Sequence, residues 1–138
     1  MISTKGRYAL RVMLDLAEQP GGDYIPLKDV AERQQISKKY LEIIVKLLVD
    51  GKLVEGVSGK GGGYKLLRRA DEYSIGEILE LAEGPLNSVA CLAEGAFPCP
   101  RAGECETLPL WTEFDELVHD FFYSKTLLDL IPEEKRVL

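Results

Sequence analysis

A short run of glycines constrains the fold of this chain more than any other segment. Residues 58–63 read Ser-Gly-Lys-Gly-Gly-Gly, and the flanking segments 53–57 and 63–67 alternate as strands do. Glycine adopts positive backbone angles without a steric penalty, so such a loop can reverse the chain tightly. The pattern therefore predicts a β-hairpin over residues 53–67.

Two predicted helices come directly before this hairpin. The first covers residues 27–34, and a tight connection follows at Gln35-Ile36. Ser37 then stands where an N-cap belongs, ahead of a longer helix that runs to about Asp50. Two helices joined by a short turn and followed by a hairpin are typical of a winged helix-turn-helix domain, which binds DNA. A helical domain with a flexible hairpin is the alternative.

The distribution of charge is compatible with DNA binding. The whole chain has a net charge of −6, but residues 37–69 contain eight basic and three acidic residues, which leaves −11 for the rest. The phosphate backbone responds to the local density of cations, so a basic segment on an acidic body can still bind DNA. At the tip of the hairpin, Lys60 could enter a minor groove. An ordinary solvated surface is the other interpretation.

The second half of the chain predicts a long helix with an apolar face. Between residues 108 and 124 this face is wide and rich in aromatic residues: Leu110, Trp111, Phe114, Leu117, Val118, Phe121 and Phe122. Because the preceding domain is already complete, we expect the face to pack against a partner chain. Packing on its own domain is the alternative.

Shorter signals complete a mainly α architecture with a small β-hairpin wing. An apolar stripe predicts a first helix over residues 7–18, and capping boxes at Ser74 and Thr126 open two short helices. We expect a winged helix-turn-helix domain over residues 1–70. A sensor and dimerisation region would cover residues 71–138, with a cysteine loop at about 86–107 and a dimer helix at about 108–124.

The chain offers no candidate for a membrane span or an export signal. No apolar run approaches the roughly 20 residues that a bilayer requires, and the first helix is amphipathic, unlike a signal peptide. The expected location is therefore the cytoplasm, where thiols stay reduced.

All three cysteines, Cys91, Cys99 and Cys105, lie in one segment rich in Gly, Pro and Glu. Such a segment has few core-forming residues, and grouped cytoplasmic thiols are more often ligands or sensors than disulfides. Thiolates favour soft metals and iron–sulfur clusters. A fourth donor would be needed, and three carboxylates are nearby: Glu94, Glu104 and Glu106. Zinc binding and metal-free redox-active thiols are the alternatives.

Several motifs resemble, in order and spacing, the Rrf-two family of bacterial winged-helix regulators of the IscR, NsrR and CymR type. They are Ser3-Thr-Lys-Gly-Arg7, Ile36-Ser-Lys-Lys-Tyr-Leu-Glu42, Gly59-Lys-Gly-Gly-Gly-Tyr64, Glu83-Gly-Pro85 and Thr126-Leu-Leu-Asp-Leu130. The resemblance implies a homodimer that binds an imperfect palindrome in double-stranded DNA. It also implies that three-cysteine members carry an iron–sulfur cluster, which tunes DNA affinity.

The resemblance also implies which residues contact DNA. By position these are Ser37, Lys38, Lys39 and Tyr40 on the recognition helix, Lys60 on the wing, and Thr4, Lys5 and Arg7 near phosphate. Glu42 could accept a hydrogen bond from a cytosine amino group or reject wrong sites. A solvated helix charge is an equally open interpretation of Glu42.

Three positions depart from the family pattern. Ser58 replaces an arginine that many relatives have in the wing, and Leu108 stands where a histidine is the fourth cluster ligand in IscR-type regulators. Arg7 stands where nitric-oxide-sensing relatives can have an acidic ligand. His119, the only histidine, lies on the expected dimer helix and is interpreted as an ordinary helix residue.

The expected function is transcriptional regulation, most simply as a repressor, with operator affinity tuned by a cluster that senses iron–sulfur status, redox state or nitric oxide. We favour a 2Fe–2S cluster on the three cysteines, with 4Fe–4S possible. The alternative is a cluster-free regulator of cysteine or sulfur metabolism, controlled by thiol oxidation or by a partner enzyme. No nucleophile–base set is evident, so the chain is not expected to be an enzyme.

Overall fold

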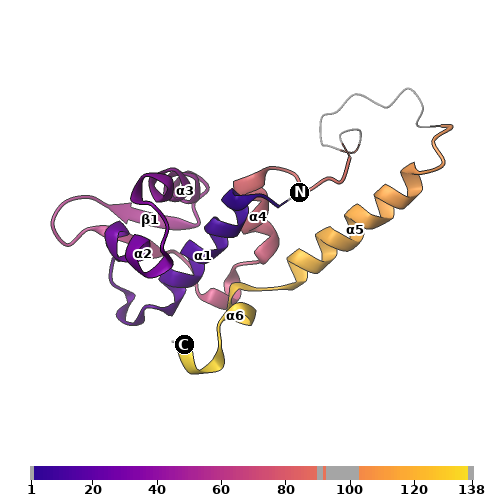
Figure 1. Ribbon diagram of the computed structural model, residues 1–138. Coiled ribbons are helices and arrows are strands. Elements are labelled where there is room, and N and C mark those ends of the chain that lie inside the picture. Colours follow the sequence, from indigo (N-terminus) through magenta and orange to yellow (C-terminus); the bar gives the residue numbers. More distant parts are fainter. Residues whose placement is uncertain (1, 90–91, 93–102, 137–138) are drawn as a thin grey trace.

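The computed structural model describes residues 2–89, 92 and 103–136. In chain order the elements are α1 (Thr4–Glu18), a 3-10 turn (Pro20–Gly22), α2 (Leu27–Gln34), α3 (Lys38–Asp50), β1 (Val54–Val57), β2 (Gly63–Leu66), a 3-10 turn (Ala70–Glu72), α4 (Ile75–Glu83), α5 (Leu108–Ser124), α6 (Leu127–Leu130) and a 3-10 turn (Glu133–Lys135). The expected architecture, mainly helical with a two-stranded hairpin and a long late helix, is confirmed (Figure 1).

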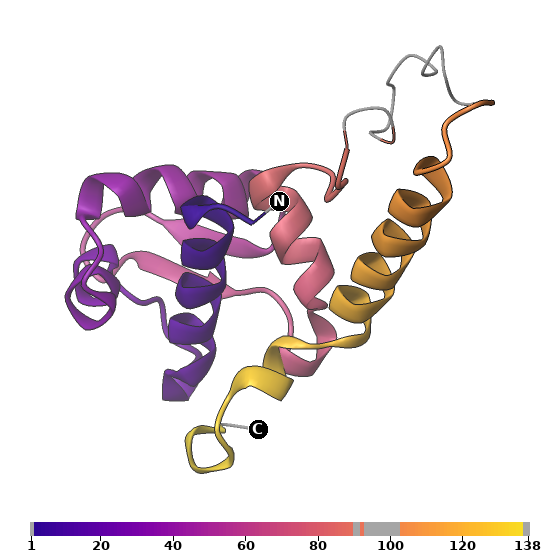
Figure 2. The same cartoon turned by 45° about the vertical axis from the view of Figure 1, so that its right-hand side comes forward.

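Helix α1 lies at the centre of the N-terminal domain, with α2, α3 and α4 around it (Figures 1 and 2). Its buried face includes Val12 and Met13, which are fully enclosed by apolar residues from the other helices. Leu41 and Ile44 of α3 and Ile78 of α4 are equally buried. This single core therefore fixes the position of α3 relative to the N-terminus and to α4.

The first helix begins earlier than the sequence analysis predicted. It starts at Thr4 instead of residue 7, because Ser3 is its N-cap and accepts a hydrogen bond on Oγ from the N–H of Lys5 at 3.2 Å. Gly6, a poor helix former, is nevertheless inside the helix and buried. The basic residues of the N-terminus therefore belong to the first turn of α1.

The hairpin is antiparallel, with Val54 paired to Leu66 and Val57 paired to Gly63. It is one residue shorter at each outer end than expected, since Leu53 and Leu67 lie outside the strands. Ile25 adds an isolated bridge to Tyr64, with both backbone hydrogen bonds formed at 2.8 and 2.9 Å. This third segment ties the base of the hairpin to the chain before α2.

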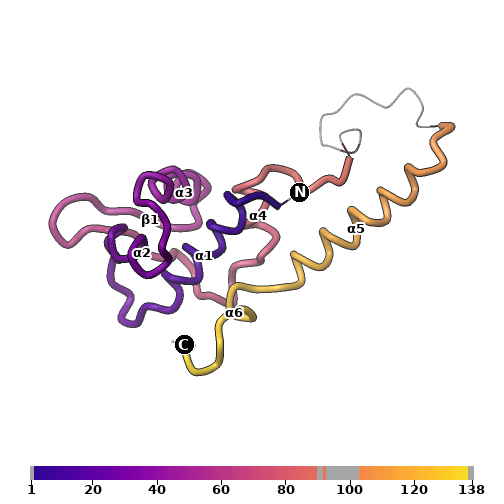
Figure 3. Tube along the Cα trace, in the orientation of Figure 1, coloured from indigo at the N-terminus to yellow at the C-terminus, as the bar shows by residue number. Residues whose placement is uncertain are grey.

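Helix α5 extends away from the N-terminal domain, and only its C-terminal part approaches α4 (Figures 1 to 3). None of its residues is buried in the single chain. Phe122 packs against the core, and the Tyr123 ring lies so close to Gly76 of α4 that an alanine Cβ there would be 2.3 Å from it. Midway along the helix, Asp115 accepts a hydrogen bond from the N–H of Ser88 at 2.9 Å, whereas the apolar side chains of Leu110 and Leu117 stay exposed.

Candidate nucleic-acid interface and cysteine segment

Helix α3 presents a polar face and buries an apolar one. Its cap is Ser37, whose Oγ accepts a hydrogen bond from the N–H of Tyr40 at 3.2 Å, as predicted. The buried face consists of Leu41, Ile44, Val45 and Leu48. The opposite face has the exposed residues Ser37, Lys38, Lys39, Glu42 and Lys46. Four of the five residues expected to contact DNA from this helix are therefore accessible.

Tyr40 is the exception, because it is half-buried where the sequence analysis placed it toward solvent. Its ring packs edge-on against that of Tyr8 on α1, with the ring centroids 5.5 Å apart. The Arg11 guanidinium lies 5.1 Å from the centroid of the Tyr8 ring. Tyr40 thus joins the start of α3 to α1 through an aromatic contact that adds to the buried area.

A buried carboxylate fixes the turn between α2 and α3. Asp15 on α1 is only 3% exposed, and it accepts hydrogen bonds from Arg33 at 2.8 and 3.1 Å and from Gln34 Nε2 at 2.9 Å. Arg11 donates to the backbone carbonyl and to the side chain of Gln34. Gln35, with φ of 55°, then turns the chain into α3. Because a buried charge is costly without such partners, this network specifies one orientation for the two helices.

The tip of the hairpin has the backbone that its glycines allow. Gly59 and Gly61 have φ of 91° and 77°, and the N–H of Gly62 donates to the carbonyl of Gly59 at 3.0 Å. Lys60 between them is exposed, as is Ser58. The expected wing cation is therefore presented on a turn that needs glycine on both sides of it.

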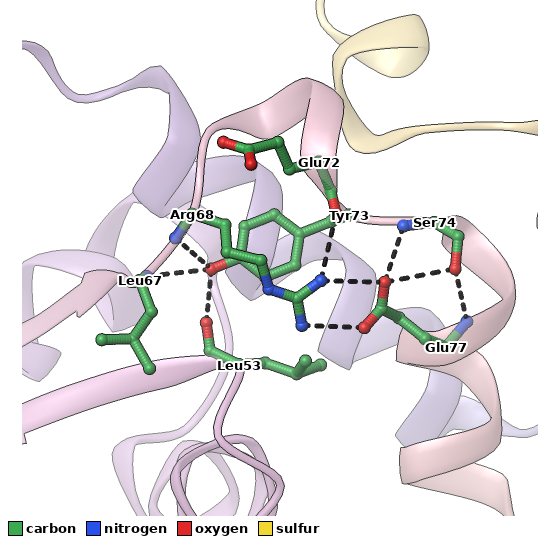
Figure 4. Close-up of polar contacts among 7 residues, drawn as sticks. All are labelled: Leu53, Leu67, Arg68, Glu72, Tyr73, Ser74 and Glu77. Carbon is green, nitrogen blue, oxygen red and sulfur yellow. Dashed lines mark hydrogen bonds and ion pairs between the residues drawn. The ribbon is translucent and has the colours of Figure 1, made fainter.

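A hydroxyl group at the centre of Figure 4 fixes the base of the wing. Tyr73 is completely buried, and its hydroxyl donates to the carbonyl of Leu53 at 2.6 Å while accepting from the N–H groups of Leu67 and Arg68 at 2.9 and 3.0 Å. Burial is the main reason why the pKa of Tyr73 is raised. The residues just before β1 and just after β2 are thus held by the same side chain.

Arg68 extends this arrangement to helix α4 (Figure 4). Its guanidinium lies over the Tyr73 ring, 4.4 Å from the centroid, and donates to both carboxylate oxygens of Glu77 at 2.8 and 3.2 Å. Glu77 also closes the capping box with Ser74 that the sequence predicted. Burial alone would raise the pKa of Glu77, but the hydrogen bonds from Arg68 and Ser74 outweigh it and lower that pKa.

The expected phosphate-contacting residues share the first turn of α1. Thr4 and Arg7 are exposed, and Lys5 is half-buried. The side chain of Glu83, the last residue of α4, accepts hydrogen bonds from the N–H and the hydroxyl of Ser3. The N-terminus therefore lies beside the end of α4, as Figures 1 and 2 show.

Sequence reasoning missed one residue of the exposed face of α3. Ile43 is 51% exposed, and on a helix it neighbours Lys39 and Lys46, which are four residues before and three residues after it. The signal was present in the sequence, because Ile43 falls outside the helical spacing of the four buried residues. Large apolar side chains are otherwise rare on this face.

Two of the three cysteines, Cys91 and Cys99, lie outside the described residues, as does Glu94. Cys105 is half-buried, with its Sγ 3.2 Å from the hydroxyl oxygen of Thr107. In the described ranges no group of three or more His, Cys, Asp or Glu side chains is placed to hold a metal ion. The expected ligand set thus stays a prediction.

A cavity of about 640 Å³ lies between α5 and the segment that follows α4. Leu92, next to Cys91 in the sequence, lines it together with four acidic residues: Glu80, Asp115, Glu116 and Asp120. His119 also lines the cavity. Its ring stacks on Tyr123 with 4.4 Å between the centroids, and its Nδ1 is 3.4 Å from Asp120. Leu108, which stands where the resemblance to IscR-type regulators leads us to expect a ligand histidine, is the first residue of α5.

A short helix, a tight turn and a capped helix with a polar outer face, followed by an antiparallel hairpin, define a winged helix-turn-helix protein. The model of the Rrf2 family, described as "Iron-dependent Transcriptional regulator", matches residues 2–133. The chain therefore belongs to the Rrf2 family, written above as the Rrf-two family.

Relatives and solved structures agree with this assignment. The "HTH-type transcriptional regulator IscR" of Sodalis glossinidius (strain morsitans) is 34% identical over 134 residues, which cover 97% of this chain and 80% of the relative. The structure of "CymR (YrzC) the Global Cysteine Regulator of B. subtilis" has a TM-score of 0.75 and 35% identity, covering 94% of this chain and 95% of that one.

T. potens IscR is similar to the same degree, with a TM-score of 0.74 and 32% identity over 94% of this chain and 85% of that one. The chain is therefore a transcriptional regulator of the IscR and CymR type, and not an enzyme. Within the described ranges, none of the helices has the length and apolar character needed to cross a bilayer.

Proposed function

We propose that this chain is a transcriptional repressor that binds double-stranded DNA as a homodimer and whose affinity is tuned by an iron–sulfur cluster. The exposed face of α3 carries the proposal, because it presents Lys38, Lys39 and Glu42 from a helix whose orientation Asp15 fixes. In helix-turn-helix proteins these N-terminal positions contact base edges. Lys60 on the wing and the first turn of α1 would add phosphate contacts. A regulator of this kind acts on DNA in the cytoplasm.

The exposed stripe on α5 supports the homodimer. Leu110, Phe114, Leu117 and Phe121 follow one another at intervals of four, three and four residues, so they share one face of the helix. Their exposed fractions are 57, 42, 63 and 56% in the single chain. A row of large apolar side chains on a projecting helix is typical of an interface. Two copies paired along α5 would present two copies of α3 to the half-sites of an imperfect palindrome.

The three thiolates of Cys91, Cys99 and Cys105 would hold the cluster. Soft thiolate donors suit iron–sulfur clusters, and the family's description as iron-dependent supports this use. The Thr107 hydroxyl, 3.2 Å from the Cys105 sulfur, can donate a hydrogen bond to it and so orient this candidate ligand. A bound cluster supplies reversible chemistry with iron, oxidants or nitric oxide. We favour 2Fe–2S over 4Fe–4S.

A specific likeness favours a second candidate, a cluster-free regulator of cysteine or sulfur metabolism. Two CymR structures from S. aureus match this chain at a TM-score of 0.73, and one of them is an "oxidized form". In this alternative, oxidation of the cysteine thiols or binding of a partner enzyme would control DNA affinity. The same winged helix would serve both mechanisms.

The first experiment is to purify the chain without oxygen and to measure visible absorption, iron, acid-labile sulfide and zinc per chain. The proposal expects about two irons with matching sulfide for a 2Fe–2S cluster, and about four for 4Fe–4S. The control is a variant with Cys91, Cys99 and Cys105 all changed to Ser, which should be colourless. A colourless wild-type protein from iron-replete cells would favour the cluster-free alternative.

DNA affinity is then measured with and without the cluster on a duplex selected from a random pool. We expect a difference in affinity for wild type and none for the triple Ser variant, since a ligand shifts an equilibrium only by its differential affinity. Identical affinity in both states would reject cluster control. In the same assay Lys60→Ala should reduce the slope of log K against log salt by roughly one, the effect of one lost phosphate contact.

A further inference from the structure

Glu83 at the end of α4 contacts the start of α1. Its carboxylate accepts hydrogen bonds from the backbone N–H and the hydroxyl of Ser3. Ser3 is in turn the N-cap of α1. A carboxylate from another helix therefore completes the capping of the helix start, where the N–H groups have no partner within the helix.

Helices α1 and α4 are so close here that a residue larger than glycine at position 6 would collide with the Glu83 side chain. A Cβ added to Gly6 would lie 2.9 Å from Cγ of Glu83 and 3.0 Å from its carboxylate. Glycine inside a helix costs about 1 kcal/mol relative to alanine, so the small residue here has a compensating role. It allows the Glu83 side chain to lie across the first turn of α1.

The charge state of Glu83 agrees with this arrangement. Burial alone would raise the pKa of Glu83, but hydrogen bonds from the Ser3 hydroxyl, the Ser3 N–H and the Gly6 N–H outweigh it and lower that pKa. The carboxylate is therefore charged at neutral pH. It lies against the first turn of α1, the turn that contains Lys5 and Arg7, which are proposed to contact phosphate.

We propose that Glu83 is a positioning residue for DNA binding, which holds the first turn of α1 so that Lys5 and Arg7 meet phosphate. The inference rests on the proposed function, since it assumes that these two cations contact DNA. Without Glu83 the start of α1 would lose its cross-helix partner and fray, and the cations would lose a fixed geometry.

If Glu83 acted only through its charge, its removal would change the DNA affinity in the opposite direction, so the two roles can be told apart. Removing a negative charge near phosphate should tighten DNA binding if Glu83 acts only through its charge. If Glu83 positions Lys5 and Arg7, its removal should weaken binding and also lower the number of phosphates contacted. The sign of the change in affinity and the salt slope therefore separate the two roles.

The experiment compares Glu83→Gln with Glu134→Gln on the selected duplex at several salt concentrations. Glu134 is exposed near the C-terminus and changes the net charge equally. We expect Glu83→Gln to weaken binding roughly threefold to tenfold and to reduce the salt slope by about one. Glu134→Gln should leave both unchanged. Affinity equal to or tighter than wild type, with an unchanged slope, would overturn the inference for Glu83.

Two further tests separate an effect on DNA binding from a loss of folding. Gly6→Ala should favour the helix intrinsically while displacing the Glu83 side chain, so weaker DNA binding with an undiminished melting temperature supports positioning. In a Lys5→Ala, Arg7→Ala background, Glu83→Gln should have no further effect, and full additivity would overturn the inference. If wild type itself shows no salt-dependent binding to any duplex, the proposed function fails, whereas failure of the variants alone leaves that function standing.

Discussion

At the scale of single residues, Tyr73 lies outside the helices but joins the two ends of the hairpin. Its buried hydroxyl is the only side-chain group bonded to both ends of the hairpin among the hydrogen bonds of the described residues. A buried backbone group that loses its partner costs about 1–3 kcal/mol. The Tyr73 hydroxyl therefore joins the two ends of the wing, in addition to the strand pairing and the bridge from Ile25.

We predict that Tyr73→Phe lowers the free energy of unfolding by about 2–3 kcal/mol, because it leaves the Leu53 carbonyl and two N–H groups without this partner. Urea unfolding measures the loss. The matched control is Tyr24→Phe, because the Tyr24 hydroxyl donates to the partly exposed Glu55 at 2.6 Å, and it should lower the free energy of unfolding clearly less than Tyr73→Phe does. Equal losses in the two variants would show that the position of the hydroxyl is unimportant.

Ile43 is exposed on the face of α3 that we propose to contact DNA, and we predict that it contacts the methyl group of a thymine. Apolar side chains contact the thymine methyl group in the major groove, and burying one such group contributes about 0.8 kcal/mol. We predict that replacing the contacted thymine by uracil in the selected duplex weakens wild type by about fourfold but leaves Ile43→Ala unaffected. Leu130→Ala, an equally exposed apolar residue on α6, should respond to uracil as wild type does. A uracil scan without effect on wild type would exclude this contact.

At the scale of elements, the junction between β2 and α4 depends on an ion pair. Arg68 and Glu77 join the end of the hairpin to the first turn of α4, with their side chains 34 and 30% exposed. The lowered pKa of Glu77 means that the folded state favours the charged carboxylate. Its contribution to stability is therefore present above the ordinary carboxyl pKa and is lost as the pH falls through the lowered one.

We predict that Glu77→Gln flattens the dependence of stability on pH below the ordinary glutamate pKa of about 4.5. At neutral pH the variant should be less stable than wild type, and the difference should shrink as the medium becomes acid. Thermal unfolding across this range measures it. The control is Glu113→Gln on the exposed side of α5, which should keep the wild-type profile. A constant difference at every pH would assign the loss to packing instead of charge.

The same scale shows which elements the sequence could predict. Helices α2 and α3 and the late helix α5 have the predicted limits, since apolar spacing defines all three and the Ser37 cap marks the start of α3. The start of α1 was missed, because Gly6 argues against a helix unless Glu83 is known to lie across it. That contact spans the chain from residue 3 to residue 83, and no local pattern contains it. The role of Tyr73 was hidden for the same reason.

The candidate site was predictable to a similar extent. Lys39, Glu42 and Lys60 were placed on exposed surface by helical spacing and by the glycine turn, and the structure confirms that placement. Tyr40 was placed toward solvent, but the Tyr8 ring, which comes from another helix, half-covers it. Ile43 was not assigned to either face, and the structure exposes it. Composition identifies the cysteine segment as a candidate site without specifying its geometry.

At the scale of the whole molecule, the uncovered face of α5 is the feature that a single chain does not explain. Leu117 is the most exposed of its large apolar residues, at 63%, and lies between Phe114 and Phe121. Covering such a row would remove a large apolar area from water at about 25 cal/mol per Å². The proposed homodimer does this and also sets the separation between two copies of α3. Dimerisation and operator recognition should therefore be lost together.

We predict that Leu117→Glu converts a dimer into a monomer, because two like charges would face each other in an apolar interface. Sedimentation velocity at micromolar concentration measures the mass. The matched control is Leu130→Glu, which adds the same charge at an exposed apolar residue outside α5 and should remain dimeric. The monomer should bind a palindromic duplex no more tightly than a single half-site, since the gain from linking two sites is lost. A Leu117→Glu protein that stays dimeric would move the interface elsewhere, and a monomer with full affinity for the palindrome would separate dimerisation from DNA recognition.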